Sequence, residues 1–303
     1  MTDNKEMSIP DLLRYFWWNK LLIIGFTIFF SVVSISYALL TTEIYESEVL
    51  IAPADNQDNA LSGIANSQLG GLAAMAGFNL GSASAVSKID LAFAILQSKD
   101  FISRFIMKYD LKPEIMAAEG WDKNNNKILY DDSVYNSETK EWLIVDEQSV
   151  EPSLQKATKK LLEKITVNPA ETNGFFKINL EAISPNIAQE WLKNLIIELN
   201  EAVRQSEQKE ASQAIKFLEE KLAIVTSSEI TAVIYQLIEE QTKRLMFTEV
   251  REQFAIKVID PAFVPEQRSH PKRGLIVIIG TILGGLLGLL VVMVRYFYSR
   301  VND

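Results

Sequence analysis

The sequence predicts an α+β membrane protein, in which two transmembrane helices flank a periplasmic α/β base domain that carries a long extended helical hairpin. Three observations predict this fold class. Uncharged apolar runs occupy residues 21–40 and 274–294 of the 303-residue chain. Apolar and polar residues alternate over 176–182 and 254–259, which is typical of half-buried strands. Residues 186–260 contain neither glycine nor proline, and residues 186–252 repeat apolar residues at helical spacing.

The first apolar run, residues 21–40, has the length of a transmembrane helix. Twenty helical residues rise roughly 30 Å, which is the thickness of the hydrocarbon core. Lys20 precedes the run, and the aromatic residues from Tyr15 to Trp18 suit the headgroup level. A cleaved signal peptide is the alternative, but the run exceeds the usual ~7–15 residues and no small-residue cleavage site follows Leu40. We therefore expect a retained span.

The second run, residues 274–294, has 21 uncharged residues, so that a buried core helix is the weaker alternative. Gly280, Gly284 and Gly288 form two overlapping G-x-x-x-G units in it. Glycine at every fourth position leaves one helix face flat, which lets another helix backbone approach closely. Glycine is also common in membrane helices without such a contact. We expect this face to contact either the first span or another subunit.

Two spans place both chain ends on the same side of a membrane. The short ends carry the orientation signal, because a long loop crosses largely regardless of its own charge. Residues 1–20 and 295–303 bear lysine and arginine, so we expect both in the cytoplasm. We expect residues 41–273 in the periplasm of a bacterial inner membrane, with membrane lipid as one partner of the chain.

Between the spans, the first expected element is a strand at residues 44–53. Residues 60–85 are rich in glycine, alanine and serine. They form either a disordered connector or an apolar loop that packs against neighbouring subunits or faces a lumen. Helical spacing follows over residues 88–110. We interpret the polar residues 111–152 as a surface insertion.

Within this insertion, Asp122, Asn124 and Asn126 match the opening of a calcium-binding loop. The sixth position of the loop is Lys127 rather than glycine, and the twelfth is Ser133 rather than glutamate. Calcium binding is therefore the weaker interpretation, and we expect no metal.

The remaining residues between the spans, from 153 onward, are expected to combine short elements with two long helices. The capping-box pattern Thr226–Glu229 divides the helical stretch into a hairpin, or leaves one longer helix if the cap is not used. The closing strand is expected to neighbour the first strand in one sheet. In order, the elements are a helix at 153–164, strands at 164–168 and 176–182, long helices over about 186–252, a closing strand at 254–259 and a proline-bearing tether at 261–271.

Composition argues against several function classes. A formal net charge of −9 is unsuited to binding nucleic acid. The chain has no cysteine and one histidine, His270, so thiol chemistry, histidine-based hydrolysis and sulfur-ligated metals have almost no side chains to use. No G-x-x-x-x-G-K-[ST] phosphate loop is present, and no motif pairs carboxylates as a glycosidase requires. We expect no enzymatic activity and no cofactor.

The order of elements and the residues from Ile238 to Gly288 resemble one known family. The specific part begins at Val258-Ile259-Asp260-Pro261 and continues through Pro265 and Pro271-Lys272-Arg273 into the glycine-rich span. With these features the chain resembles the Wzz-type chain-length determinants, which are the polysaccharide co-polymerases.

The resemblance implies a non-enzymatic regulator of the modal chain length of lipopolysaccharide O-antigen or a related lipid-linked polysaccharide. It implies a homo-oligomeric ring that acts as a scaffold for a Wzy-type polymerase, without catalytic residues. Relatives that carry or recruit a tyrosine kinase are less similar, because nine residues without a phosphate loop follow Val294. The implied tether and partner-contact residues are Pro261, Pro265, Pro271, Lys272 and Arg273, and the implied transmembrane packing residues are Gly280, Gly284 and Gly288.

A two-span sensor or adaptor of the cell envelope is the alternative function. A sensor requires a cytoplasmic output domain. The roughly twenty residues before the first span and the nine after the second leave little room for one, so we favour the regulator.

Overall fold

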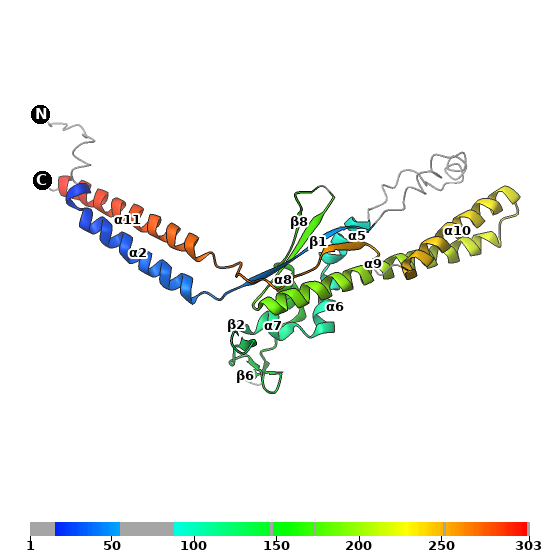
Figure 1. The fold of residues 1–303 in the computed structure, drawn as a ribbon, viewed down its shortest axis with the longest axis horizontal. Helices are drawn as coiled ribbons and strands as arrows, with labels where there is room; N and C mark the ends of the chain where they lie inside the picture. The colour runs from blue at the N-terminus through cyan, green and yellow to red at the C-terminus, as the bar shows by residue number, and fades with distance from the viewer. Residues whose placement is uncertain (1–15, 55–87, 146–147, 173, 251–252, 302–303) are drawn as a thin grey trace, which may run out of the picture. The chain divides into compact units, whose positions relative to one another are not determined.

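The computed structural model describes residues 16–54, 88–145, 148–172, 174–250 and 253–301, and these form two units (Figure 1). The helix-pair unit is built from the chain up to Ile44 and from Gln267 onward. The central unit runs from Tyr45 to Glu266. The glycine- and alanine-rich loop expected at 60–85 lies outside the described residues.

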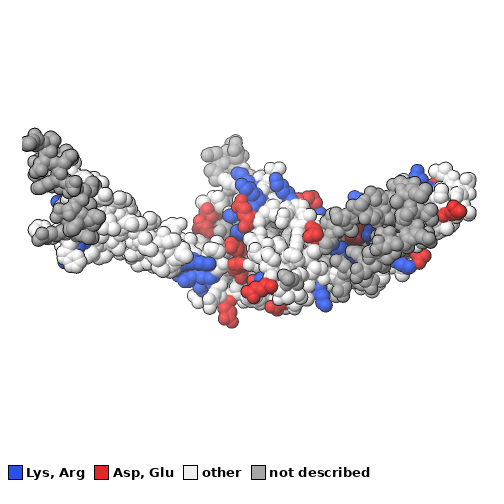
Figure 2. Space-filling model, turned by 90° about the horizontal axis from the view of Figure 1, so that it is seen from above, with Lys and Arg blue, Asp and Glu red and all other residues white. Residues whose placement is uncertain are grey.

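The helix-pair unit consists of α2 (Lys20–Leu40) and α11 (Arg273–Val301), which pack side by side along their length. Both helices are long and apolar enough to cross a membrane, judged by length and composition. Figure 2 shows this unit as almost free of charged side chains except near its ends, whereas both signs of charge are interspersed over the central unit.

A four-stranded antiparallel sheet organises the central unit, in the order β10-β1-β9-β8. The adjacency of the first and last strands is therefore confirmed. In β1 every second residue from Tyr45 to Ile51 is buried, as the alternating pattern predicts. The strands are β1 (Tyr45–Pro53), β8 (Ile165–Pro169), β9 (Phe176–Ala182) and β10 (Ile256–Asp260).

The closing strand starts two residues later than the sequence predicts. Phe254 and Ala255 are buried before the strand begins. The side-chain oxygen of Asn200, which is also buried, accepts hydrogen bonds from the backbone N–H groups of Ala255 and Ile256, each at 3.0 Å. The Asn200 amide nitrogen donates to the Ile256 carbonyl at 3.0 Å. Asn200 therefore satisfies backbone groups at the start of β10, beside the pairing of Ile256 with Pro53 in β1.

Four shorter helices complete the base of the central unit. The helical region expected at 88–110 is divided in two, because the Ser98 hydroxyl accepts a hydrogen bond from the Phe101 N–H at 3.2 Å and caps a new helix. Phe101, Phe105 and Leu161 are buried in the shared core. The four helices are α5 (Lys88–Leu96), α6 (Lys99–Tyr109), α7 (Lys112–Met116) and α8 (Leu154–Leu162).

The predicted helical hairpin is confirmed as α9 (Pro185–Leu222) and α10 (Ser228–Val250). The 38 residues of α9 extend over roughly 57 Å without a break. Its first half packs on β1 and β9, where Leu192, Leu195 and Leu199 are fully buried. Its second half packs against α10.

The polar insertion expected at 111–152 contains three small two-stranded hairpins. At the residues that match the opening of a calcium-binding loop, the Asp122 carboxylate accepts the Asn124 N–H at 2.9 Å, and Asn126 has a positive φ of 50°. These features make a tight turn, in which hydrogen bonds from Asn125 and Asn124 lower the pKa of Asp122. The strands are β2 (Ala118–Asp122), β3 (Lys127–Tyr130), β4 (Tyr135–Asn136), β5 (Glu141–Trp142), β6 (Ile144–Val145) and β7 (Gln148–Ser149).

Candidate functional site

The glycine face of α11 lies against α2 of the same chain. An added Cβ at Gly284 would lie 2.7 Å from the Phe30 Cβ, and one at Gly288 would lie 3.1 Å from the Ile23 Cα. Real Cβ atoms do not approach neighbours within about 3.0 Å, so Gly284 in particular cannot carry a side chain without a shift of the helices. The structure thus selects the first span from the two contacts that the sequence allows.

Gly280 extends the same contact toward the other end of α2. Its added Cβ would lie 2.6 Å from the Ser34 Cβ. Ser34, Phe30 and Ile23 follow each other at helical spacing along α2 as Gly280, Gly284 and Gly288 do along α11, in the opposite direction. The helices are therefore antiparallel and in close backbone contact along a small-residue face, which suits helix association in lipid.

Two hydroxyl groups near this contact are satisfied within their own helices. Thr27 donates to the Ile23 carbonyl at 2.9 Å, and Thr281 donates to the Val277 carbonyl at 2.7 Å. Hydrocarbon offers no hydrogen-bond partner, so internal bonds of this kind are what a lipid environment requires. The outward side chains are apolar, for example Phe29 at 63% exposed and Ile282 at 58% exposed.

Glu43 links the segment after α2 to the segment that leads into α11, at one end of the helix pair. One oxygen of its carboxylate lies 2.8 Å from an Arg268 Nη atom and 3.1 Å from an Arg273 Nη atom. Arg273 Nε also donates to the Ala38 carbonyl at 3.0 Å. A cation at this place caps a carbonyl near the C-terminal end of α2 and complements the helix dipole.

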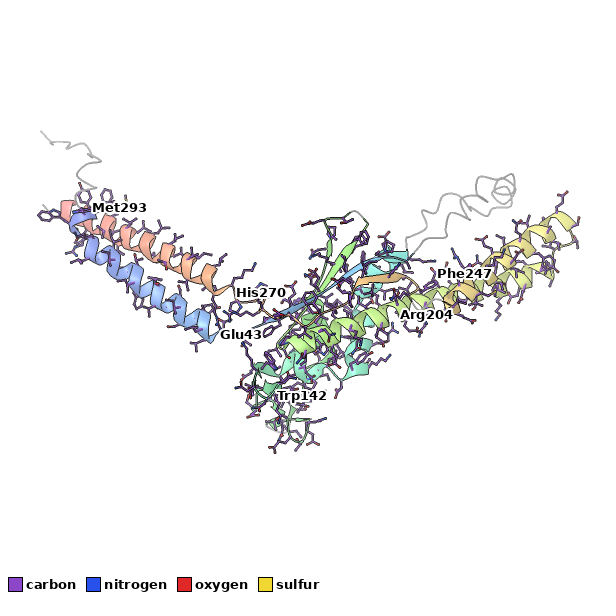
Figure 3. All side chains as sticks on the ribbon, in the orientation of Figure 1. Glu43, Trp142, Arg204, Phe247, His270 and Met293 are labelled. Carbon is purple, nitrogen blue, oxygen red and sulfur yellow. The ribbon has the colours of Figure 1, made fainter. Side chains whose placement is uncertain are left out.

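Backbone hydrogen bonds join the same two segments, and we call this place the junction of the helix pair. The Ile44 N–H donates to the His270 carbonyl at 3.0 Å, and the Ser269 N–H donates to the Ile44 carbonyl at 2.8 Å. Figure 3 shows Glu43 and His270 at the same end of the helix pair. Sequence reasoning missed Glu43 and Arg268 as a pair, because 225 residues separate them. The sequence features that could have indicated this pair are the acidic residues that follow the first span and the cationic residues that precede the second.

The predicted tether residues do not form one cluster. Pro261 and Pro265 belong to the central unit, where the intervening backbone is held by side chains of the base. The Ser47 hydroxyl donates to the Phe263 carbonyl at 2.8 Å, and Gln189 donates to the Ala262 carbonyl at 3.3 Å. Pro265 is buried, whereas Pro261 is exposed.

Pro271, Lys272 and Arg273 instead begin α11 in the helix-pair unit. The Lys272 carbonyl accepts the Leu275 N–H at 2.9 Å, which starts the first turn, and the Lys272 side chain is exposed. The peptide bond between His270 and Pro271 is cis. Of the three, Arg273 is the residue that the structure places in the junction with Glu43.

Comparison with known proteins identifies two matching segments. Residues 5–109 match the family model described as "Chain length determinant protein" (Wzz). Residues 226–297 match a model described as "G-rich domain on putative tyrosine kinase". No curated protein matches the chain. The Wzz resemblance inferred from the sequence is confirmed by the first match.

The solved structures that match this chain share little sequence with it. A full-length bacterial polysaccharide co-polymerase is 15% identical, with 98% of this chain and 100% of that chain covered and a TM-score of 0.42. A fragment of WzzB, a polysaccharide co-polymerase from Salmonella Typhimurium, is 15% identical. The match covers 76% of this chain and 100% of that chain, with a TM-score of 0.33. A mutant of the Shigella flexneri lipopolysaccharide O-antigen chain-length regulator is 12% identical, with 75% and 100% covered and a TM-score of 0.25.

The two family matches fall on segments that the structure joins. The first match includes α2 and β1, and the second includes β10 and most of α11. In the helix-pair unit α2 packs on α11, and in the central unit β1 pairs with β10. The ends of the chain that carry the similarity are thus the ones that build the candidate site.

Proposed function

We propose that this chain is a non-enzymatic regulator of polysaccharide chain length, which sets the modal length of lipopolysaccharide O-antigen or a related lipid-linked surface polysaccharide. The observation that carries the proposal is the match of residues 5–109 to the chain length determinant family. The pairing of α2 with α11 supports it, because this pairing unites that segment with the second matched segment, residues 226–297.

The proposed location is the bacterial inner membrane, crossed by α2 and α11, with the central unit in the periplasm. The lengths of the two helices, their outward apolar side chains and the satisfied hydroxyls between them support the crossing. The cations at residues 1–20 and 295–303 support cytoplasmic ends.

The proposed working form is a homo-oligomeric ring that acts as a scaffold for a Wzy-type polymerase and its lipid-linked product. The α9–α10 hairpin supports self-association, because it carries large apolar side chains on its outer surface that water does not favour. We expect the tether from Pro261 to Arg273 and the glycine face to support assembly and contact with the polymerase. The exposed apolar residues of the hairpin are Phe217, Ile224, Ile230, Tyr235, Met246, Phe247 and Val250.

Deletion of the encoding gene from its source bacterium tests this function. We expect the ladder of surface polysaccharide on a gel to lose or shift its modal length while total polysaccharide synthesis continues. Re-expression of the wild-type chain should restore the original distribution. An unchanged ladder would remove the proposed function, and loss of all polysaccharide would instead indicate a role in synthesis.

A further inference from the structure

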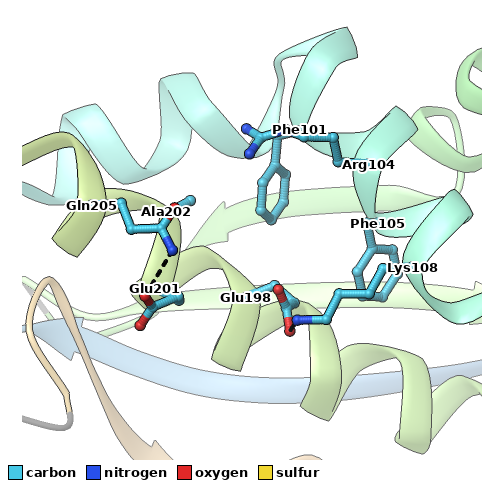
Figure 4. A pocket seen from close by; sticks show the side chains of 8 residues that line it. All are labelled: Phe101, Arg104, Phe105, Lys108, Glu198, Glu201, Ala202 and Gln205. Atoms are coloured by element: carbon cyan, nitrogen blue, oxygen red, sulfur yellow. Dashed lines mark hydrogen bonds and ion pairs between the residues drawn. The ribbon is translucent and has the colours of Figure 1, made fainter.

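A cleft lies between α6 and α9 in the central unit, outside the glycine face and the tether. Its volume is about 220 Å³, which is below the ~300–1,000 Å³ of pockets for drug-sized ligands. Figure 4 shows side chains from both helices converging on it. The lining residues are Phe101, Arg104, Phe105, Lys108, Glu198, Glu201, Ala202 and Gln205.

The floor of the cleft is apolar and fixed. Phe101 and Phe105 stand one helical turn apart on α6, and they are 4% and 2% exposed. Ala202 faces them from α9 and leaves space because its side chain is small. The ring of Phe105 also packs against Tyr109, with 5.0 Å between the ring centroids. The floor therefore offers ring edges in a position set by core packing.

The rim of the cleft has two cations on one helix and two carboxylates on the other. Arg104 and Lys108 come from α6, and Glu198 and Glu201 come from α9. The formal charges of these four side chains cancel. The carboxylates would repel an anionic ligand. An apolar ligand would bury the charged groups of the rim without offering them hydrogen bonds. The rim thus favours a ligand that is neutral and polar.

Hydrogen bonds hold the rim groups in place. Lys108 Nζ lies 2.6 Å from a Glu198 carboxylate oxygen, and the Tyr109 hydroxyl donates to the same oxygen at 2.9 Å. The hydrogen bond to Glu198 raises the pKa of Lys108. Glu201 is held likewise, by Gln205 at 2.9 Å and Arg204 at 3.1 Å. Each carboxylate has more lone pairs than these bonds use, and can accept further donors.

We propose that this cleft binds one neutral sugar ring of a polysaccharide, an inference that rests on the proposed function. Sugar hydroxyl groups both donate and accept, so they match a rim of carboxylates, an amide and cationic donors. The C–H groups of a pyranose ring match the aromatic floor. The small volume of the cleft suits a single ring rather than a longer segment.

The binding test uses the full chain, purified in detergent. The probe is the surface polysaccharide of the source bacterium, released from its lipid by mild acid and made neutral by reduction of any carboxyl groups. Polygalacturonate serves as a polyanion of similar build. We expect saturable binding of the neutral probe by calorimetry or ligand-observed magnetic resonance, and at least tenfold weaker binding of the polyanion. Equal binding of both probes, or no binding of the neutral one, would overturn the proposal.

Three variants locate the site. Ala202→Phe fills the cleft, and we expect it to weaken binding at least tenfold. Glu201→Gln and Gln205→Ala change the rim without adding bulk, and we expect each to weaken binding about threefold to tenfold. Gln213→Phe is the matched control, because Gln213 is exposed on the same helix and does not line the cleft. Unchanged binding in all three variants, with native melting curves, would place the sugar elsewhere.

The two proposals fail in different ways. If deletion of the gene leaves the ladder unchanged but the chain binds sugar through the cleft, the regulator function fails and the site stands. If the ladder depends on the chain but the cleft variants bind like the wild type, the site fails and the regulator function stands.

Discussion

The two helix pairs of this molecule use the same antiparallel arrangement with different chemistry. The pair α2–α11 contains no charged residue between Leu21 and Leu40 and packs through glycine. The pair α9–α10 has no glycine at all and buries Leu218 and Ile234 instead. Glycine allows backbones to meet where burying apolar side chains gains nothing from water, and larger side chains fill the interface where water drives burial.

The outer surfaces of the two pairs differ in the same way. Outward residues of α2–α11 are apolar over nearly the whole length, which suits lipid on all sides. The outer surface of α9–α10 mixes ion pairs, such as Glu239 with Lys243 at 2.6 Å, with exposed apolar residues such as Phe247 (labelled in Figure 3). A mixed surface of this kind suits contact with another protein in water. The comparison predicts that substitutions act differently on the two pairs.

The largest effect is expected where the hairpin joins the sheet. Asn200→Leu leaves the buried N–H groups of Ala255 and Ile256 without their acceptor. Each orphaned buried group costs about 1–3 kcal/mol, so we expect roughly 2–5 kcal/mol less stability in denaturant unfolding. The control is Gln213→Leu on the exposed side of the same helix, which should change stability by less than about 0.5 kcal/mol. Equal effects would show that Asn200 does not anchor the hairpin.

The next effect concerns the glycine face. Gly284→Leu forces α11 away from Phe30, and overpacking of this kind costs about 1–3 kcal/mol. We expect a lower melting temperature in detergent without loss of membrane insertion, which alkaline extraction of membranes measures. Gly25→Leu is the matched control, because nothing lies within 4 Å of its added Cβ. A similar loss in both variants would contradict the packing role.

A smaller effect is expected at the junction of the helix pair. Glu43→Gln removes the charge that Arg268 and Arg273 share, and partly exposed ion pairs of this kind contribute about 1 kcal/mol. We expect a modest fall in melting temperature that high salt reproduces in the wild type. Glu239→Gln, which breaks an exposed pair on α10, serves as the comparison and should leave melting unchanged. No change in the Glu43 variant would show that the backbone bonds alone hold the junction.

The smallest effect on stability, but a large one on assembly, is expected at the tip of the hairpin. Ile224→Ser combined with Ile230→Ser replaces apolar side chains that are 72% and 48% exposed. The free energy of unfolding should change by less than about 0.5 kcal/mol per site, because neither side chain is buried. Native mass spectrometry should show smaller oligomers than the wild type. Oligomers of unchanged size would remove the hairpin tip from the assembly surface.

Local patterns sufficed to predict much of this fold. Alternation identified β9, and uninterrupted helical spacing identified α9 and α10, because such periods reflect which face is buried. Glycine at every fourth position identified Gly280, Gly284 and Gly288 as a packing face. It did not identify the helix that packs there, because the spacing on one helix carries no information about the other. Side-chain contacts between distant residues were not predictable, and the pairing of Glu43 with Arg268 is the clearest case.

The division of the 88–110 region and the late start of β10 were also missed. In each case one polar side chain decides the local structure. Ser98 caps a second helix within an apolar pattern that continues across it. Asn200 competes for backbone groups that the alternating pattern assigns to a strand. The α6–α9 cleft was missed because its lining residues, such as Phe101 and Glu201, follow ordinary helical patterns on two separate helices.

One complementation experiment tests the central claim, that the glycine-packed helix pair anchors a regulator of polysaccharide length. The gene is deleted from the source bacterium and re-expressed as the wild type, Gly284→Leu or Gly25→Leu, at equal membrane levels. The surface polysaccharide is then resolved on a gel. We predict that the wild type and Gly25→Leu restore the modal length, while Gly284→Leu gives a shifted or dispersed distribution. The same ladder in all these strains, including the deletion, would contradict the account.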